Sequence, residues 1–191
     1  MVHTYKKNLN FALMGAAGYI APRHLEAVQA IGGKLIAAMD PSDSVGILDR
    51  YFPDARFFTS FERFERFVSK KRETDQPIDF VSICSPNHLH DTHCRFALNN
   101  HAYAICEKPL VLMPDNLERL HKSEEEAGKK IFCILQLRHH EKIIQLKDRV
   151  TQNPEKRFTV NLTYITSRGP WYDISWKGDE TKSGGILFNI G

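Results

Sequence analysis

The amino-acid sequence predicts an α/β fold: a doubly wound parallel sheet, then the start of an incomplete α+β second domain with an open antiparallel sheet. Short apolar runs alternate with helical patterns as far as residue 153, which is typical of parallel βαβ units. A turn rich in glycine follows the first run, and strict apolar/polar alternation begins only after residue 154. We therefore divide the chain into residues 8–153 and residues 154–191.

The first apolar run begins a strand–turn–helix–strand unit. The run at 11–14 is short and ends in glycine, as buried parallel strands do. Gly32 and Gly33 then provide the helix stop signal, and the second strand ends at Asp40. The expected elements are a strand at 11–14, a turn at 15–18, a helix at 19–28 and a strand at 34–39.

The same alternation continues to residue 150. Thr59 and Glu62 are spaced as a capping box before a helix. The buried face of that helix would carry Phe61, Phe64, Phe67 and Val68. Further strands are expected at 79–84, 102–106 and 130–135. A helix should follow each of these strands. The first should end near Asn100, and the second should run from Asp115 to Gly128 with Leu117 and Leu120 inward. The third should carry Ile143, Leu146 and Val150.

The character of the chain changes after Pro154. Four apolar residues alternate with polar ones, which predicts a strand with one buried face. They are Phe158, Val160, Leu162 and Tyr164. An isolated amphipathic strand cannot bury its apolar face alone. Either the rest of this domain lies outside the sequence, or another chain covers the face.

Composition excludes several classes of protein. Hydrophobic residues make up 42% of the 191 residues and charged residues 26%, as in an ordinary globular protein. The net charge of +3 is spread without long runs of one sign, so we expect no nucleic-acid partner and no membrane surface. Since no apolar stretch reaches the roughly 18 residues of a membrane helix, we expect a cytoplasmic protein.

The turn at 15–18 has the features of a dinucleotide site. It reads G-x-x-G-x-x-A, one residue longer than G-x-G-x-x-G, and it lies between a strand and a helix. Asp40 follows Gly15 by 25 positions, against about 20 for the acid that binds the adenosine ribose. An acid there disfavours a ribose phosphate, so NAD is expected rather than NADP. The alternative is that Gly15 and Gly18 only make a tight turn.

Lys108 is the candidate catalytic residue. It follows a predicted strand, and ligands of doubly wound sheets collect at the carboxyl ends of strands. Oxidation of an alcohol by hydride transfer requires a group that accepts the hydroxyl proton. Desolvation beside a nicotinamide ring would favour the neutral amine, whereas Glu107 would oppose it. The alternative is a solvated loop lysine.

Two motifs carry a resemblance to a known family. With Ser85-Pro86-Asn87-His88-Leu89-His90 and Cys106-Glu107-Lys108-Pro109-Leu110, the sequence resembles the glucose-fructose oxidoreductase / inositol dehydrogenase / MocA family. The segments at 15–24, 164–172 and 175–178 resemble the subgroup of UDP-N-acetylglucosaminuronate 3-dehydrogenases of lipopolysaccharide O-antigen biosynthesis. The glycine turn with its extra residue is a feature of that subgroup.

The resemblance implies an NAD-binding Rossmann domain at 8–153 and the beginning of a substrate and oligomerisation domain at 154–191. It also implies oxidation of C3 of a UDP-sugar acid, 2-oxoglutarate as the oxidant that recycles NAD, and a homo-oligomer. Two alternatives stay open: a catalytically silent NAD-binding or interaction module, and a dehydrogenase of another sugar.

The resemblance also assigns site residues. The catalytic residue is Lys108. The cofactor residues are Gly15, Ala17, Gly18, Tyr19, Ile20, Asp40, Ser85, Pro86, Asn87, His90, Glu107, Lys108 and Gln136. The substrate residues are Arg168, Trp171, Tyr172, Trp176 and Asn189. For the aromatic residues the alternative is a loop that closes a small core.

In the family pattern, one residue and then a catalytic histidine follow Asn189-Ile190-Gly191, where this sequence ends. The alternatives are a piece of a longer enzyme and a truncated gene product. In both cases we expect NAD binding with very slow or no turnover.

No metal is expected. The cysteines have no C-x-x-C spacing and are interpreted as reduced core thiols: Cys84, Cys94, Cys106 and Cys133. The histidines lack a complementary ligand cluster. We interpret them as helix-surface or loop residues, with His90 in the cofactor site by resemblance: His88, His90, His93, His139 and His140.

Overall fold

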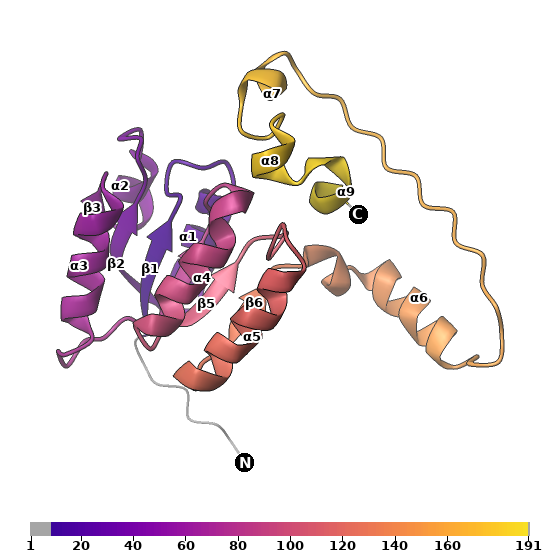
Figure 1. Ribbon diagram of the computed structural model, residues 1–191, viewed down its shortest axis with the longest axis horizontal. Helices are drawn as coiled ribbons and strands as arrows, with labels where there is room; N and C mark the ends of the chain where they lie inside the picture. Colours follow the sequence, from indigo (N-terminus) through magenta and orange to yellow (C-terminus); the bar gives the residue numbers. More distant parts are fainter. Residues whose placement is uncertain (1–8, 191) are drawn as a thin grey trace.

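The computed structural model describes residues 9–190, except for the side chains of residues 187, 189 and 190. Its centre is a six-stranded sheet in the order β3-β2-β1-β4-β5-β6, and every pairing is parallel (Figure 1). The strands are β1 (Asn10–Met14), β2 (Lys34–Met39), β3 (Arg56–Phe58), β4 (Phe80–Ile83), β5 (Tyr103–Cys106) and β6 (Ile131–Cys133). This strand order is that of the Rossmann fold, so the predicted doubly wound parallel sheet is confirmed.

Helices cover both faces of the sheet. They are α1 (Ala21–Ala30), α2 (Ile47–Tyr51), α3 (Phe61–Lys71), α4 (His90–Asn99), α5 (Asp115–Ala127), α6 (Glu141–Thr151), α7 (Trp171–Ile174), α8 (Glu180–Ser183) and α9 (Gly185–Ile190), with the short 3-10 helices η1 (Asn87–Leu89) and η2 (Gln136–His139). Ala12 and Met14 pack in one core cluster with residues of α3, α4 and α5. Phe11 and Leu13 pack on the other face with α1 and α2. This two-sided burial explains why β1 is apolar at successive positions.

Several helix boundaries agree with the sequence. The helix α5 begins at Asp115 and ends at Ala127, and the C-cap residue Gly128 has the left-handed conformation with a φ of 62°. The predicted cap of α3 was wrong by one residue: the Ser60 hydroxyl, not Thr59, accepts from the Arg63 N–H and donates to Glu62. The prediction for Leu117 was also wrong. Leu117 is 52% exposed, and Leu120 is the one residue of α5 that is buried.

The predicted second sheet is absent from the described part of the chain. Residues 156–169 form neither helix nor strand and run as an extended segment away from the sheet (Figure 1). The predicted inward-facing side chains are all exposed, from 40% at Phe158 to 85% at Leu162. A strand needs a hydrogen-bonded neighbour, and residues 9–190 provide none for this segment. The short helices α7, α8 and α9 follow it and return to the Rossmann domain.

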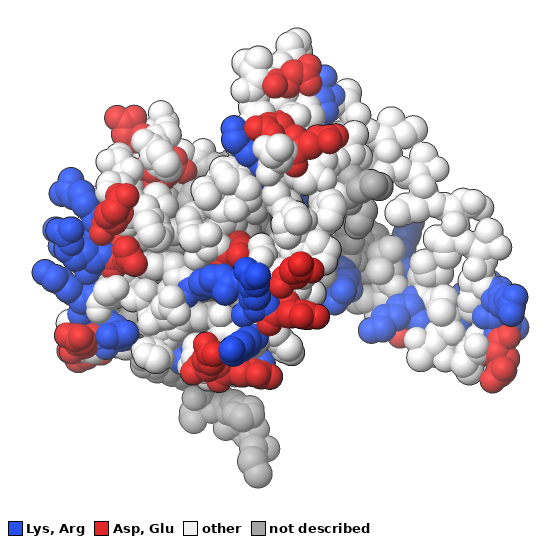
Figure 2. Space-filling view, viewed as in Figure 1, with Lys and Arg blue, Asp and Glu red and all other residues white. Residues whose placement is uncertain are grey.

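On the face shown in Figure 2, charged residues of both signs cover the described part of the chain, with Lys and Arg interspersed among Asp and Glu. Among the helices of residues 9–190, none is both long and apolar enough to cross a membrane.

Candidate cofactor and active site

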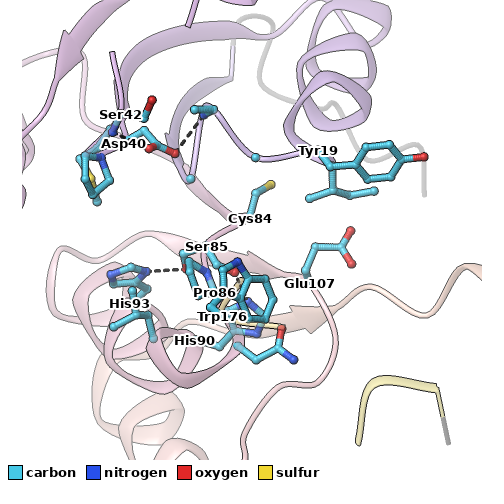
Figure 3. A pocket seen from close by; sticks show the side chains of 18 of the residues that line it. Tyr19, Asp40, Ser42, Cys84, Ser85, Pro86, His90, His93, Glu107 and Trp176 are labelled. Atoms are coloured by element: carbon cyan, nitrogen blue, oxygen red, sulfur yellow. Dashed lines mark hydrogen bonds between the residues drawn. The ribbon is translucent and has the colours of Figure 1, made fainter. Parts of the chain in front are cut away.

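A cavity of about 960 Å³ lies at the carboxyl ends of β1, β2, β4 and β5 (Figure 3). This volume is near the upper end of the roughly 300–1,000 Å³ usual for ligand sites. Every residue predicted to bind the cofactor lines the cavity, including Tyr19 and Gln136 at positions far apart in the sequence. The structure thus brings together residues from the segments that follow five different strands, β1, β2, β4, β5 and β6.

The turn after β1 requires glycine at position 15 because a side chain there would clash with the backbone after β4. Gly15 has a φ of +84°, and a Cβ atom there would lie 2.5 Å from the backbone carbon of Cys84. The Gly15 N–H also donates to the Met39 carbonyl at 2.8 Å. The ends of β1, β2 and β4 are therefore in close backbone contact at Gly15. These backbone contacts hold the turn in its conformation without a ligand.

Helix α1 begins directly after this turn. Its N-terminus has no side-chain cap, and Tyr19 and Ile20 just before it line the cavity. The positive end of the helix dipole therefore borders the cavity, which suits a phosphate group.

Asp40, the first residue after β2, accepts hydrogen bonds from two backbone N–H groups. Its Oδ2 accepts from the Ala17 N–H at 3.0 Å, and its Oδ1 accepts from the Ser42 N–H at 2.9 Å. Figure 3 shows the carboxylate next to the glycine turn. A carboxylate has about four lone-pair sites, so both oxygens can accept further hydrogen bonds from a ligand.

His90 joins the turn after β4 to the turn after β5. Its Nε2 lies 2.8 Å from the Ser85 carbonyl oxygen, and its Nδ1 lies 2.7 Å from the Pro109 carbonyl oxygen. Burial lowers the pKa of His90, opposed by these two carbonyls. The imidazole thus lies between the backbone at Ser85 and the backbone at Pro109, whose peptide bond with Lys108 is cis.

His93 is not the surface histidine that was expected. It is 5% exposed, lies stacked on Phe61 with ring centroids 5.8 Å apart, and its Nδ1 is 2.8 Å from the Ser85 hydroxyl (Figure 3). Burial, followed by the nearby His90 and His88, lowers its pKa to about 4. His93 follows His90 by three positions on α4, so both side chains lie on the buried face of this helix.

Glu107 and Lys108 are adjacent in sequence and both lie at the cavity. The Glu107 Oε1 lies 3.1 Å from the His24 Nε2 on α1, and both side chains are nearly buried. Lys108 is half-buried and lines the cavity. The carboxylate of Glu107 is thus engaged by α1, on the side of the cavity where Tyr19 lies (Figure 3).

The predicted substrate residues divide into two groups. Trp176 lines the cavity, whereas Arg168, Trp171 and Tyr172 are not among its lining residues. The last three form one cluster: the Arg168 guanidinium lies 5.2 Å from the Tyr172 ring centroid, and the Trp171 and Tyr172 rings are 5.9 Å apart. The Asn189 side chain lies outside the described residues.

A hydrogen bond attaches the C-terminal segment to the cavity. The Asn87 Nδ2 donates to the Ser183 carbonyl at 2.8 Å, and both groups are buried. The segment 171–183 therefore packs over the end of β4, which places Trp176 at the cavity.

Lining residues that sequence reasoning missed include Lys177, His93, Phe61 and Ser42. Lys177 follows Trp176 within the motif at 175–178, which was the available signal.

Within residues 9–190, no group of three or more His, Cys, Asp or Glu side chains could hold a metal ion. The four cysteines have free thiols, three of them buried and Cys133 half-buried, and burial raises the pKa of Cys84 well above its usual value.

Comparison with known proteins identifies the relatives. The chain is similar to the WlbA (WbpB) dehydrogenase of Thermus thermophilus. The structure of that enzyme with NAD and alpha-ketoglutarate shows 48% identity and a TM-score of 0.91, over 96% of this chain and 59% of that chain. Its structure with NAD and UDP-GlcNAcA shows 46% identity and a TM-score of 0.88 over the same shares.

Among characterised sequences, D-glucoside 3-dehydrogenase of Escherichia coli K12 is 28% identical over 115 residues, which are 59% of this chain and 32% of that enzyme. The chain thus spans well under two thirds of the relatives it matches. Residues 9–135 match the model of the GFO/IDH/MocA oxidoreductase family with its NAD-binding Rossmann fold. The chain belongs to the GFO/IDH/MocA oxidoreductase family.

Proposed function

We propose that this chain is the cofactor-binding part of an NAD-dependent dehydrogenase that oxidises the C3 hydroxyl of a UDP-N-acetylglucosaminuronate-type sugar. The WlbA dehydrogenase, at 48% identity, supports the proposal because its structures hold NAD with alpha-ketoglutarate or with UDP-GlcNAcA. In this proposal alpha-ketoglutarate (2-oxoglutarate) is the oxidant that recycles the cofactor, and residues 154–191 belong to the substrate domain.

The observation that supports the proposal most directly is the separation of Asp40 and Lys108 along the cavity. Asp40 follows β2 and Lys108 follows β5, and β1 and β4 lie between these two strands. Three strand spacings of about 4.8 Å separate the two ends by about 14 Å. An extended dinucleotide fits this geometry: its adenosine ribose would bind Asp40, its pyrophosphate the turn at 15–18, and its nicotinamide would lie near Lys108.

When bound, the nicotinamide accepts the hydride that leaves C3 of the sugar. In the neutral form, Lys108 accepts the proton of the C3 hydroxyl, so that the C–H and O–H bonds break together and a ketone forms. His90 lies within hydrogen-bond distance of the carbonyls of Ser85 and Pro109, donates to one of them in its neutral form, and so helps to position the backbone next to Lys108. Trp176 limits the access of water at this end of the cavity.

For reduction of the 2-oxo acid, Lys108 returns a proton to the ketone oxygen as the hydride moves back from the cofactor. Lys108 therefore takes part in both half-reactions. The residue acts as base in the first and as acid in the second.

Titration calorimetry tests the proposal. We expect the folded chain to bind NAD more tightly than NADP, and the NAD-loaded chain to bind UDP-GlcNAcA. If circular dichroism shows folded protein that does not bind NAD, the cofactor assignment is wrong. If NAD binds but UDP-GlcNAcA does not, the chain is a nucleotide-binding module and the assigned substrate is wrong.

A further inference from the structure

Lys177 is a cavity residue to which the proposed function gives no role. It lies in the turn between α7 and α8, is half-buried, and lines the same cavity as Lys108. Its ammonium lies 5.5 Å from the Trp171 ring centroid and 5.7 Å from that of Trp176. Two indole rings therefore hold the positive charge in a fixed, partly dehydrated position at the cavity.

Two other cations lie close to Lys177. Burial lowers the pKa of Lys177, and the charges of Arg168 and Lys108 lower it further. Arg168 is packed on Tyr172, the neighbour of Trp171, so the same aromatic cluster positions both cations. Lys177 and Lys108 both line the cavity, and Arg168 adds a third positive charge from outside the cavity lining.

The acidic residues that line the cavity contact groups other than Lys177. The acids that line it are Asp40 and Glu107. Asp40 lies at the other end, where it binds the turn after β1, and Glu107 contacts His24. Asp179, near Lys177 in sequence, pairs with Lys182 at 3.1 Å. Like charges held together in a partly desolvated place favour an anionic ligand.

We propose that Lys177 binds the carboxylate of the ligand whose carbon exchanges a hydride with the cofactor, so that one cation selects both the sugar acid and the 2-oxo acid. The inference rests on the proposed function and deepens it. Both UDP-GlcNAcA and alpha-ketoglutarate, the ligands in the WlbA structures, carry a carboxylate. Only the first carries a diphosphate. Lys177 is thus a specificity-determining residue that distinguishes acidic ligands from neutral sugars.

The test uses the full NAD-loaded chain and three ligands in titration calorimetry. UDP-GlcNAcA has a carboxylate and a diphosphate, 2-oxoglutarate has carboxylates only, and UDP-N-acetylglucosamine has the diphosphate only. A hydrogen bond between charged groups contributes about 1.5–3 kcal/mol. Lys177→Gln should therefore weaken UDP-GlcNAcA and 2-oxoglutarate about tenfold or more and leave UDP-N-acetylglucosamine unchanged. Lys177→Arg should restore part of the loss.

Lys182→Gln is the matched control, since it removes a lysine of the same segment that is paired with Asp179. It should change none of the three affinities. If Lys177→Gln weakens the binding of UDP-N-acetylglucosamine as much as that of UDP-GlcNAcA, Lys177 binds the diphosphate. If Lys177→Gln weakens the binding of NAD, Lys177 binds the cofactor. Either result overturns the inference.

The remaining outcomes separate the two proposals. If the unsubstituted chain binds the acidic ligands and Lys177→Gln binds them equally well, the inference about Lys177 is wrong and the proposed function stands. If the unsubstituted NAD-loaded chain binds none of the ligands, both proposals fail.

Discussion

The backbone N–H of Ala17 donates a hydrogen bond of 3.0 Å to the Oδ2 of Asp40, so the glycine turn and the end of β2 are directly joined. The carboxylate therefore has a fixed orientation before a ligand arrives. Its negative charge lies where the adenosine ribose would bind, and a 2′-phosphate there would meet an anion at short range.

Replacing this charge should change the cofactor preference. In Asp40→Asn the side-chain oxygen can still accept from Ala17, but the charge is gone. We expect the preference for NAD over NADP, measured as the ratio of dissociation constants in calorimetry, to fall about tenfold or more. Asp43→Asn, an exposed residue in the same loop, is the control. An unchanged ratio in Asp40→Asn would rule out this role of Asp40.

Gly15 and Gly128 provide a matched pair for the stability of the turn. Both have positive φ, but a Cβ at Gly15 would lie 2.5 Å from the Cys84 backbone, whereas a Cβ at Gly128 would meet no atom within 4 Å beyond its chain neighbours. Gly128→Ala should cost about 1 kcal/mol of unfolding free energy from the backbone conformation alone. Gly15→Ala should cost at least about 3 kcal/mol or prevent folding, because backbone atoms must move. Urea denaturation measures both, and equal costs would contradict the contact at Cys84.

The Rossmann domain could be predicted from the sequence because its signals are local. The apolar runs that became β1, β2 and β4 are buried on both faces, and such runs are visible without knowledge of their neighbours. The strand β3 and helix α2 were missed, since Arg56–Phe58 and Ile47–Tyr51 are too short to show a period.

The errors concern features that depend on distant partners. The segment at 156–169 has the alternating pattern of a strand. It forms no strand because residues 9–190 provide no neighbouring strand to pair with it. His93 was assigned to the surface because its burial depends on Phe61 from another helix. Lys177 was missed because its position at the cavity depends on how residues 171–183 pack over η1.

The boundary near residue 154 predicts a protease-sensitive site. Residues 156–169 are exposed, except for the half-buried Gly169, and have no regular hydrogen-bonded structure, and such segments are cleaved first. Brief trypsin treatment should cut after Lys156, Arg157 or Arg168 and leave the Rossmann domain intact, as mass spectrometry would show. Early cleavage within α3 or α4 instead would contradict the proposed division at 153/154. Resistance at all three sites would mean that the segment is covered in solution.

Buried His93 should make stability depend on pH between about 4 and 6.5. In the unfolded chain a histidine binds a proton near pH 6.5, whereas the pKa of His93 in the folded chain is lowered to about 4. Between these values the unfolded state binds more protons, so the free energy of unfolding falls as the pH falls. The contribution of His93 is complete above about pH 6.5, and its loss approaches about 3 kcal/mol at pH 4 and below.

Urea titrations at several pH values test this expectation. His93→Gln removes the titrating group, so its unfolding free energy should fall less steeply between pH 6.5 and 4 than that of the unsubstituted chain. Part of the slope should remain, because burial also lowers the pKa of His90. His139→Gln, at an exposed position, should retain the full slope. Parallel curves for His93→Gln and the unsubstituted chain would show that His93 is protonated as readily when folded as when unfolded, which would contradict its burial against Ser85 and Phe61.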